Sequence, residues 1–179
     1  MITDVLISHA QAAMDCYEIF GTLKPKLWAV APSGASLVAE PLTAKSEASE
    51  PAKQRILSAM VHSAAPAFIG RCDEVWFSAA HLDRTQALEA LAEEDPRIRT
   101  GIQAVALDCK RMVLASLLVE PFLDDDGTQR WRQIGVDAKL FAGPKKLLVQ
   151  ATKAERDDLS LIDVSDALGW AVFTLEGDS

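Results

Sequence analysis

The segment 101–135 constrains the fold most, because it holds the longest run of apolar, strand-forming residues in the chain. Within it, 102–108 and 113–121 are separated by four residues, and the acidic, glycine-ended sequence 124–127 precedes 129–135. Short connections of this kind are typical of antiparallel strands joined by tight turns. Both alternating sets of side chains in the middle strand are largely apolar, as in a central strand covered on both faces. The segment therefore predicts a three-stranded meander.

The N-terminal part predicts a helix, a hairpin and a second helix, in that order. Apolar residues recur at helical spacing over 3–20, and Gly21 follows as a C-terminal cap. Two apolar runs within 27–42 flank a Pro-Ser-Gly-Ala sequence, which is typical of a tight turn. The next helix begins after Ser46 or Ser49, either of which can cap it.

The later segments are less uniform. Residues 67–80 predict a strand with an irregularity at Gly70, and 81–100 predict a loop that contains a short helix. Residues 145–179 leave helix and strand open, because apolar residues at helical spacing alternate there with runs of strand-forming composition.

This order of elements predicts one α+β domain over 1–179. Its antiparallel, twisted sheet would consist of the hairpin, the strand that follows and the meander, with the helices packed on one face. A chain of 179 residues is long enough to bury a core of this kind without disulfides or metals.

Three stretches carry a resemblance to a known group of proteins: LWAVAPSG (27–34), EVWFSAAH (74–81) and DDDG (124–127). Together they resemble a pattern found in a widespread family of small uncharacterised bacterial and phage α+β proteins. There, a hairpin with a Ser-Gly turn is followed by a helix and by a strand that ends in aromatic and small residues. The resemblance spans about the first three quarters of the chain and implies the fold; it implies no activity.

Composition excludes several classes of function. The formal net charge of −8 disfavours nucleic acid and anionic membranes as partners. No apolar run approaches the ~20 residues needed to span a bilayer, and the N-terminus lacks the basic cluster of a secretory signal. Cys16, Cys72 and Cys109 are widely spaced, which indicates free thiols rather than disulfides or a zinc site. We expect a cytoplasmic protein.

Motifs for metals and cofactors are not found. His9, His62 and His81 have no spacing typical of metal ligands, and the Asp-rich sequence 124–127 lacks the pattern of a calcium loop. The Gly-Pro-Lys-Lys sequence at 143–146 is not a phosphate-binding loop. The sequence therefore predicts no cofactor and no metal.

The absence of catalytic motifs favours a non-catalytic protein-interaction or regulatory module, of a kind that phages and mobile elements encode. The segment 130–156 contains seven basic residues and two acidic ones, a local net charge of +5 in an acidic chain. Aromatic and arginine side chains are enriched at binding hot spots. The predicted partner-binding residues are Arg130, Trp131, Arg132, Lys145 and Lys146. The alternative is that these basic side chains form solvated ion pairs with the acidic remainder.

A small enzyme remains the alternative function. The loop 81–100 brings together His81 and Asp83 as acid/base residues with arginines that could hold an anion. These arginines are Arg84, Arg97 and Arg99.

A homodimer is also predicted. The strand at 67–80 carries few charges, and an uncharged sheet edge must be paired or covered.

Overall fold

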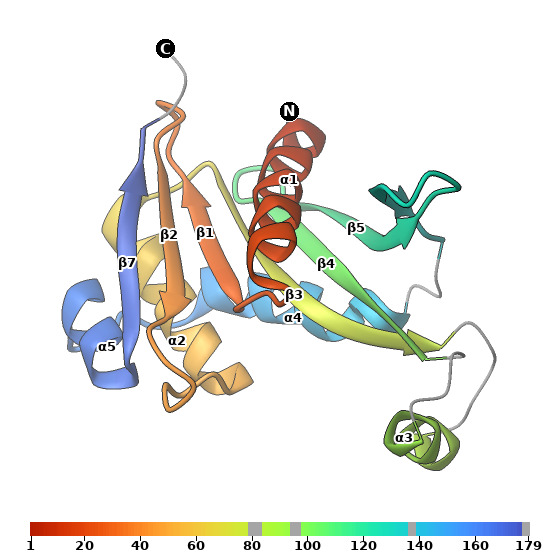
Figure 1. Ribbon diagram of the computed structural model, residues 1–179. Coiled ribbons are helices and arrows are strands. Elements are labelled where there is room, and N and C mark those ends of the chain that lie inside the picture. Colours follow the sequence, from red (N-terminus) through yellow and green to blue (C-terminus); the bar gives the residue numbers. More distant parts are fainter. Residues whose placement is uncertain (79–83, 94–97, 136–138, 177–179) are drawn as a thin grey trace.

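The computed structural model describes residues 1–78, 84–93, 98–135 and 139–176. Its centre is one antiparallel, seven-stranded sheet in the order β6-β5-β4-β3-β1-β2-β7, with helices on both faces (Figure 1). The strands are β1 (Lys26–Val30), β2 (Ser36–Pro41), β3 (Phe68–Ser78), β4 (Ile98–Asp108), β5 (Val113–Leu123), β6 (Gln129–Gln133) and β7 (Trp170–Leu175). The helices are α1 (Ile2–Phe20), α2 (Glu50–Ala64), α3 (Arg84–Ala92), α4 (Lys139–Lys153) and α5 (Leu161–Leu168). The predicted α+β class with an antiparallel sheet is confirmed, as are the hairpin β1–β2 and the meander β4–β5–β6.

Helices cover both faces of the sheet. Because successive side chains of a strand point to opposite faces, each central strand contributes to a core on either side. In β1, Leu27 and Ala29 pack against the core under α2, α4 and α5, whereas Trp28 and Val30 pack in the core under α1. Figure 1 shows α1 on one side of the sheet, with α2, α4 and α5 on the other. The prediction that all helices pack on one face holds for α2, α4 and α5 and not for α1.

The long hairpin β3–β4 differs from the sequence-based expectation in two ways. Strand β4 begins at Ile98, so Arg99 and Thr100 belong to a strand rather than to the predicted loop. Strand β3 pairs with β4 in continuous register through Gly70, where an irregularity was expected. A glycine is needed there for another reason: a Cβ atom would lie 2.0 Å from Cζ2 of Trp28.

Helix α1 follows its predicted stripe only in part. Leu6, Ala10 and Ala13 are buried against the sheet, and Gly21 ends the helix with a φ of 72°. Phe20 lies on the predicted stripe, yet its side chain is 72% exposed. The last turn of α1 therefore presents an aromatic ring beyond its packed surface.

Helix α4 contains Pro144, although a proline in a helix interior removes one hydrogen bond. The carbonyl that loses this bond is that of Leu140, four residues earlier. The buried side chain of Gln103 in β4 donates its Nε2–H to that oxygen at 3.0 Å. The proline thus leaves an acceptor that a sheet residue uses, and this bond joins α4 to the sheet.

The C-terminal residues, for which the sequence left helix and strand open, form a helix and then a strand, and two caps mark the ends of the helix. Ser160 accepts a hydrogen bond from the backbone amide of Asp163 and begins α5, as expected of an N-cap serine. Gly169 ends α5 with a φ of 76°, a conformation that favours glycine. The chain then turns into β7, which pairs with β2 and forms one edge of the sheet.

Candidate functional site

The α1 side of the sheet is covered only in part. Helix α1 packs on β3, β4 and β5, and its His9 reaches Trp28 in β1. Of the helices that the structure describes, none lies in front of β2 and β7 on this side (Figure 1). Alternation and register assign six side chains of β2 and β7 to this surface, which we call the open face: Ser36, Val38, Glu40, Ala171, Phe173 and Leu175.

A pocket of about 590 Å³ lies where the open face meets the end of α1. Its lining comes from α1, the following loop and three strands: Cys16, Phe20, Thr22, Leu23, Lys24, Lys26, Glu40 and Phe173. The ring of Phe173 is 39% exposed, and that of Phe20 is exposed still further. Small-molecule sites are typically apolar and occupy about 300–1,000 Å³, so this pocket has the size and character of such a site.

The pocket is lined by three charged side chains, whose net charge is +1. Lys26 and Glu40 are neighbours on β1 and β2, and the Lys26 ammonium lies 2.5 Å from the Glu40 carboxylate. Lys24 contacts the backbone carbonyl of Leu42 at 3.4 Å. Among the described residues, no carboxylate lies within ion-pair distance of Lys24. The pocket therefore carries a neutral pair and one ammonium group that has no counter-ion among the described residues.

The two edges of the sheet differ in charge. Strand β6 carries Arg130 and Arg132, and charged side chains are a common protection of a sheet edge. Strand β7, with the sequence WAVFTL, carries no charge. It thus lacks the usual feature that prevents pairing with another strand.

The hydrogen-bond pattern identifies the groups at the β7 edge. Pro41, which has no N–H, faces the first residue of β7, and the Leu42 amide donates to the Gly169 carbonyl at 2.9 Å. That bond is the one expected beside a non-hydrogen-bonded pair of an antiparallel ladder. Every second residue from the start of β7 then turns its N–H and C=O away from β2. These groups include the amides and carbonyls of Val172 and Thr174, which point to the free edge.

The predicted partner-binding arginines both have carboxylate partners. Arg130 forms an ion pair with Asp124 in the preceding turn. Arg132 donates to Glu120 at 2.7 Å and lies over the ring of Phe122. These pairs agree with the alternative that the basic side chains form ion pairs within the chain.

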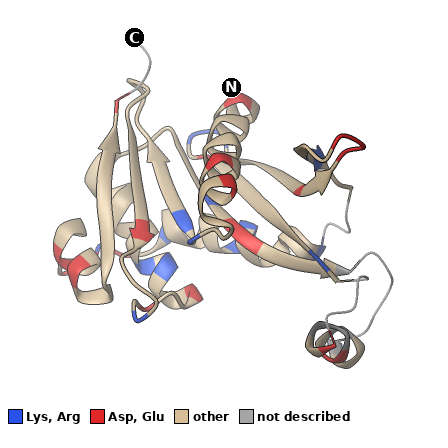
Figure 2. Ribbon diagram, in the orientation of Figure 1, with Lys and Arg blue, Asp and Glu red and all other residues tan. Residues whose placement is uncertain are grey.

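Of the other three predicted residues, Trp131 lies on the opposite side of the sheet from the arginines, and the two lysines belong to a different element. Trp131 points to the α1 side of the sheet, where its Nε1–H donates to Glu18 at 2.7 Å. Lys145 and Lys146 lie on α4, and the Lys145 ammonium is 5.6 Å from the centre of the Phe141 ring. Figure 2 shows Lys and Arg spread among Asp and Glu over several elements. The five residues therefore do not form the single basic surface with an aromatic anchor that the hypothesis requires.

The alternative catalytic residues can be placed only in part. His81, Asp83 and Arg97 lie outside the described residues. Arg84 is the first residue of α3, which lies beyond the end of the β3–β4 hairpin (Figure 1). Arg99 lies in β4 and donates to the buried carboxylate of Glu120 at 3.0 Å. The enzyme hypothesis thus stays a prediction, with Arg99 already engaged in a structural ion pair.

The two described histidines have structural contacts. The His9 ring stacks on Trp28 with 4.1 Å between ring centres, and burial lowers the pKa of His9 to about 4. The Nε2 atom of His62 lies 3.0 Å from the carbonyl oxygen of Ala154. Within the described ranges, no group of three His, Cys, Asp or Glu side chains is placed to hold a metal ion.

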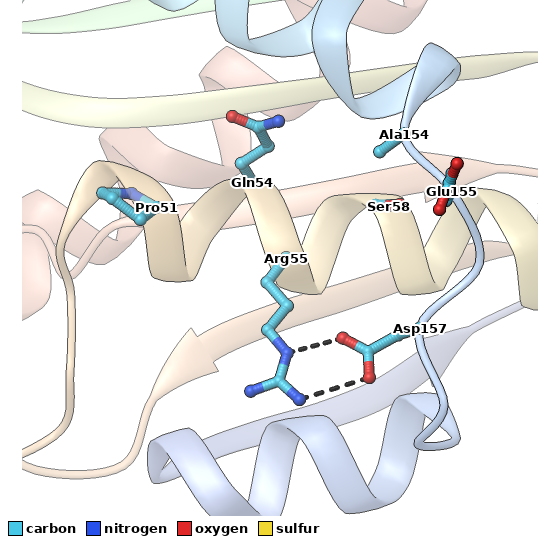
Figure 3. Close-up of a pocket in the computed structure, with 7 residues that line it drawn as sticks. All are labelled: Pro51, Gln54, Arg55, Ser58, Ala154, Glu155 and Asp157. Carbon is cyan, nitrogen blue, oxygen red and sulfur yellow. Dashed lines mark hydrogen bonds and ion pairs between the residues drawn. The ribbon is translucent and has the colours of Figure 1, made fainter.

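A second, smaller pocket of about 280 Å³ lies between α2 and the segment after α4 (Figure 3). Arg55 donates to both carboxylate oxygens of Asp157, at 2.5 and 3.2 Å. These hydrogen bonds lower the pKa of Asp157 to about 2. Because Arg55 already forms a two-pronged pair with the chain's own carboxylate, this pair joins two segments rather than forming an anion site.

A cluster of four charged side chains at α2 and β3 is paired within the chain. Arg71 donates to Asp73 at 2.6 Å and to both oxygens of Glu50, while Lys53 contacts Asp73 at 3.1 Å. Two cations and two anions thus balance under α2. Paired groups of this kind satisfy each other and leave no charge for a ligand.

The pocket beside the open face was not predicted from the sequence. One signal was present: Phe20 continued the apolar stripe of α1 into the residue before Gly21, although nothing indicated what it would contact. Its other walls come from segments far apart in the chain, such as Lys26 and Phe173.

Comparison of the chain with protein-family models, curated proteins and solved structures found no significant match. The predicted membership of a family of small bacterial and phage proteins therefore stays a prediction. Each described helix is too short or too polar to cross a membrane.

Proposed function

We propose that this chain is a non-catalytic protein-interaction module that associates through the free edge of β7. The observation that supports the proposal is the uncharged edge itself, with the amides and carbonyls of Val172 and Thr174 pointing outward. Such an edge is a template for pairing with a strand of another chain. Strand addition supplies main-chain hydrogen bonds, and neighbouring side chains add specificity.

The first partner we propose is a second copy of this chain. An antiparallel pair of identical strands is self-complementary, because a twofold axis brings the same donors and acceptors together on both chains. An edge without charges brings no like charges together when it meets its own copy. The exposed side chains of Phe173 and Leu175 would extend the open face across such a pair. This proposal moves the predicted homodimer contact from β3, which is a central strand, to β7.

The proposed location is the cytoplasm. Three free cysteines fit a reducing compartment, in which thiols are kept reduced. The formal charge of −8 supports a protein partner over nucleic acid.

The test is the mass of the purified chain in solution, measured by light scattering over a range of concentrations. The wild type should rise above the mass of a single 19.4 kDa chain as its concentration increases. Thr174→Pro removes one outward N–H while leaving the bonds between β7 and β2, and Thr174→Lys adds a charge to the edge. Each variant should need at least about tenfold higher concentration to associate, which corresponds to a loss of about 1.4 kcal/mol in the free energy of association.

The matched control is Gln129→Lys, which adds the same charge to the opposite edge at β6 and should associate like the wild type. Thermal unfolding verifies that the variants remain folded. The proposal fails if the wild type keeps the mass of one chain at hundreds of micromolar. It also fails if the folded Thr174 variants associate as strongly as the wild type.

A further inference from the structure

We propose that the pocket between the end of α1 and the open face binds a small apolar carboxylate, with Lys24 holding the carboxylate group. The pocket is the one of about 590 Å³ that Phe20, Lys24, Lys26, Glu40 and Phe173 help to line. This site is independent of association through the β7 edge, because it uses side chains on the open face rather than the backbone of the edge.

The apolar walls of the pocket favour a ligand with a hydrocarbon part. Leu23 lies in the core beneath the pocket, and the rings of Phe20 and Phe173 stand at its sides with much of their surface exposed. Removing apolar surface from water contributes about 25 cal/mol per Å², so a hydrocarbon ligand between the two rings would be stabilised by burial. Exposed apolar surface around a concave site is a common mark of ligand binding.

The charge of the pocket selects an anion. The Lys26 and Glu40 side chains neutralise each other at 2.5 Å, so neither attracts a ligand charge strongly. Lys24 has only the Leu42 carbonyl as a partner among the described contacts, at 3.4 Å. A carboxylate beside Lys24 would form a charge-assisted hydrogen bond, whereas a cationic head group would meet a like charge. An uncharged ligand would gain only the apolar contacts.

Cys16 provides a readout inside the pocket. It lines the cavity and is half-buried, whereas Cys72 is buried. Burial raises the pKa of the Cys72 thiol to about 12 and that of Cys109 to about 11. Because the thiolate is the reactive form, these two cysteines should react slowly near neutral pH. Alkylation by iodoacetamide should therefore occur mainly at Cys16, and a ligand in the pocket should slow it.

The experiment compares three probes with the same hydrocarbon chain: decanoate, decanol and decyltrimethylammonium. Binding is measured by calorimetry, and the rate of Cys16 alkylation is measured by mass spectrometry of peptides. Decanoate should bind at least about tenfold more tightly than the cation and should slow alkylation of Cys16 several-fold. Lys24→Met keeps most of the side chain and removes its charge, so it should weaken decanoate about tenfold and leave decanol unchanged.

The matched control is Lys45→Met, which removes an exposed lysine outside the pocket and should leave all three affinities unchanged. Phe173→Ala should weaken decanoate and decanol alike, because it removes a wall. Equal binding of decanoate and the cation would overturn the assignment of an anion. Unchanged alkylation of Cys16 with saturating decanoate would overturn the assignment of the pocket.

These results separate the two proposals. Thr174→Lys should still bind decanoate if only the edge is altered, and Lys24→Met should still associate like the wild type. If the wild type associates through β7 but binds decanoate no better than the cation, the pocket proposal alone is refuted. If it binds decanoate selectively but does not associate, the edge proposal alone is refuted.

Discussion

Mild acid should destabilise the fold through His9. Its ring is stacked on Trp28 at an interplanar angle of 4°, and burial lowers its pKa from 6.5 to about 4. In the unfolded chain the imidazole is solvated and titrates near its ordinary value of about 6.5. Between these values the unfolded state binds a proton that the folded state does not. The contribution of the neutral, buried His9 to the free energy of unfolding is therefore fully present above the unfolded pKa. It is lost as the pH falls through the folded pKa.

The size of the effect follows from the pKa shift. One pKa unit corresponds to about 1.4 kcal/mol, so the full shift corresponds to about 3 kcal/mol. Linkage between proton binding and folding gives a loss of about 2 kcal/mol between about pH 7 and about pH 5. That loss is a large fraction of the free energy of unfolding of an ordinary domain, which is about 5–15 kcal/mol.

The assay is urea unfolding followed by circular dichroism at both pH values. His9→Phe keeps an aromatic ring on Trp28 and cannot take up a proton, so its free energy of unfolding should fall by about 2 kcal/mol less than that of the wild type over this range. His62→Gln removes the other described histidine and should keep the pH dependence of the wild type. If His9→Phe lost as much stability on acidification as the wild type, the reasoning would be refuted.

Two further predictions concern the core, and both are measured as free energies of unfolding in urea. Gly70→Ala should destabilise the fold by about 3 kcal/mol because the new Cβ would overlap Trp28, whereas Gly135→Ala, at an exposed site with open space around a Cβ, should change the stability by less than about 0.5 kcal/mol. Similar effects of the two substitutions would contradict this account. Gln103→Leu should cost about 1–2 kcal/mol by leaving a carbonyl of α4 without a donor. In a Pro144→Ala background, Gln103→Leu should cost less stability, because the amide of residue 144 can then donate to that carbonyl. An equal cost in both backgrounds would contradict this role of Gln103.

Most elements could be predicted because local chemistry determines them. Gly21 ends α1 in the left-handed conformation that was expected, and Ser49 caps α2 by accepting a hydrogen bond from the amide of Ala52. The failures have a common cause in contacts from elsewhere in the chain. The Trp28 ring, and not a bulge, explains Gly70. Pro144 is tolerated inside α4 while a side chain of β4 bonds to the freed carbonyl.

The candidate sites were predicted less well than the elements. The basic segment was identified from its charge, but charge along the sequence does not say which side chains share a face. Adjacent positions in a strand point to opposite sides, so Trp131 is separated from Arg130 and Arg132 by the sheet itself. A charge excess in the sequence also does not reveal the carboxylates that neutralise it, such as Glu120.

By itself, the sequence determined the apolar period of each segment, the turns between segments and the caps at their ends, because these depend on neighbours within a few residues. Only the tertiary structure decided that β7 returns to pair with β2 and leaves an uncharged edge. It also decided that α1 covers the second face and stops short of the open face, where Lys26 and Phe173 meet in one pocket. Backbone hydrogen bonds between strands are the same for any pair of strands, so strand order depends on how all the apolar faces are buried together. That depends on the whole chain at once, and no single segment carries it.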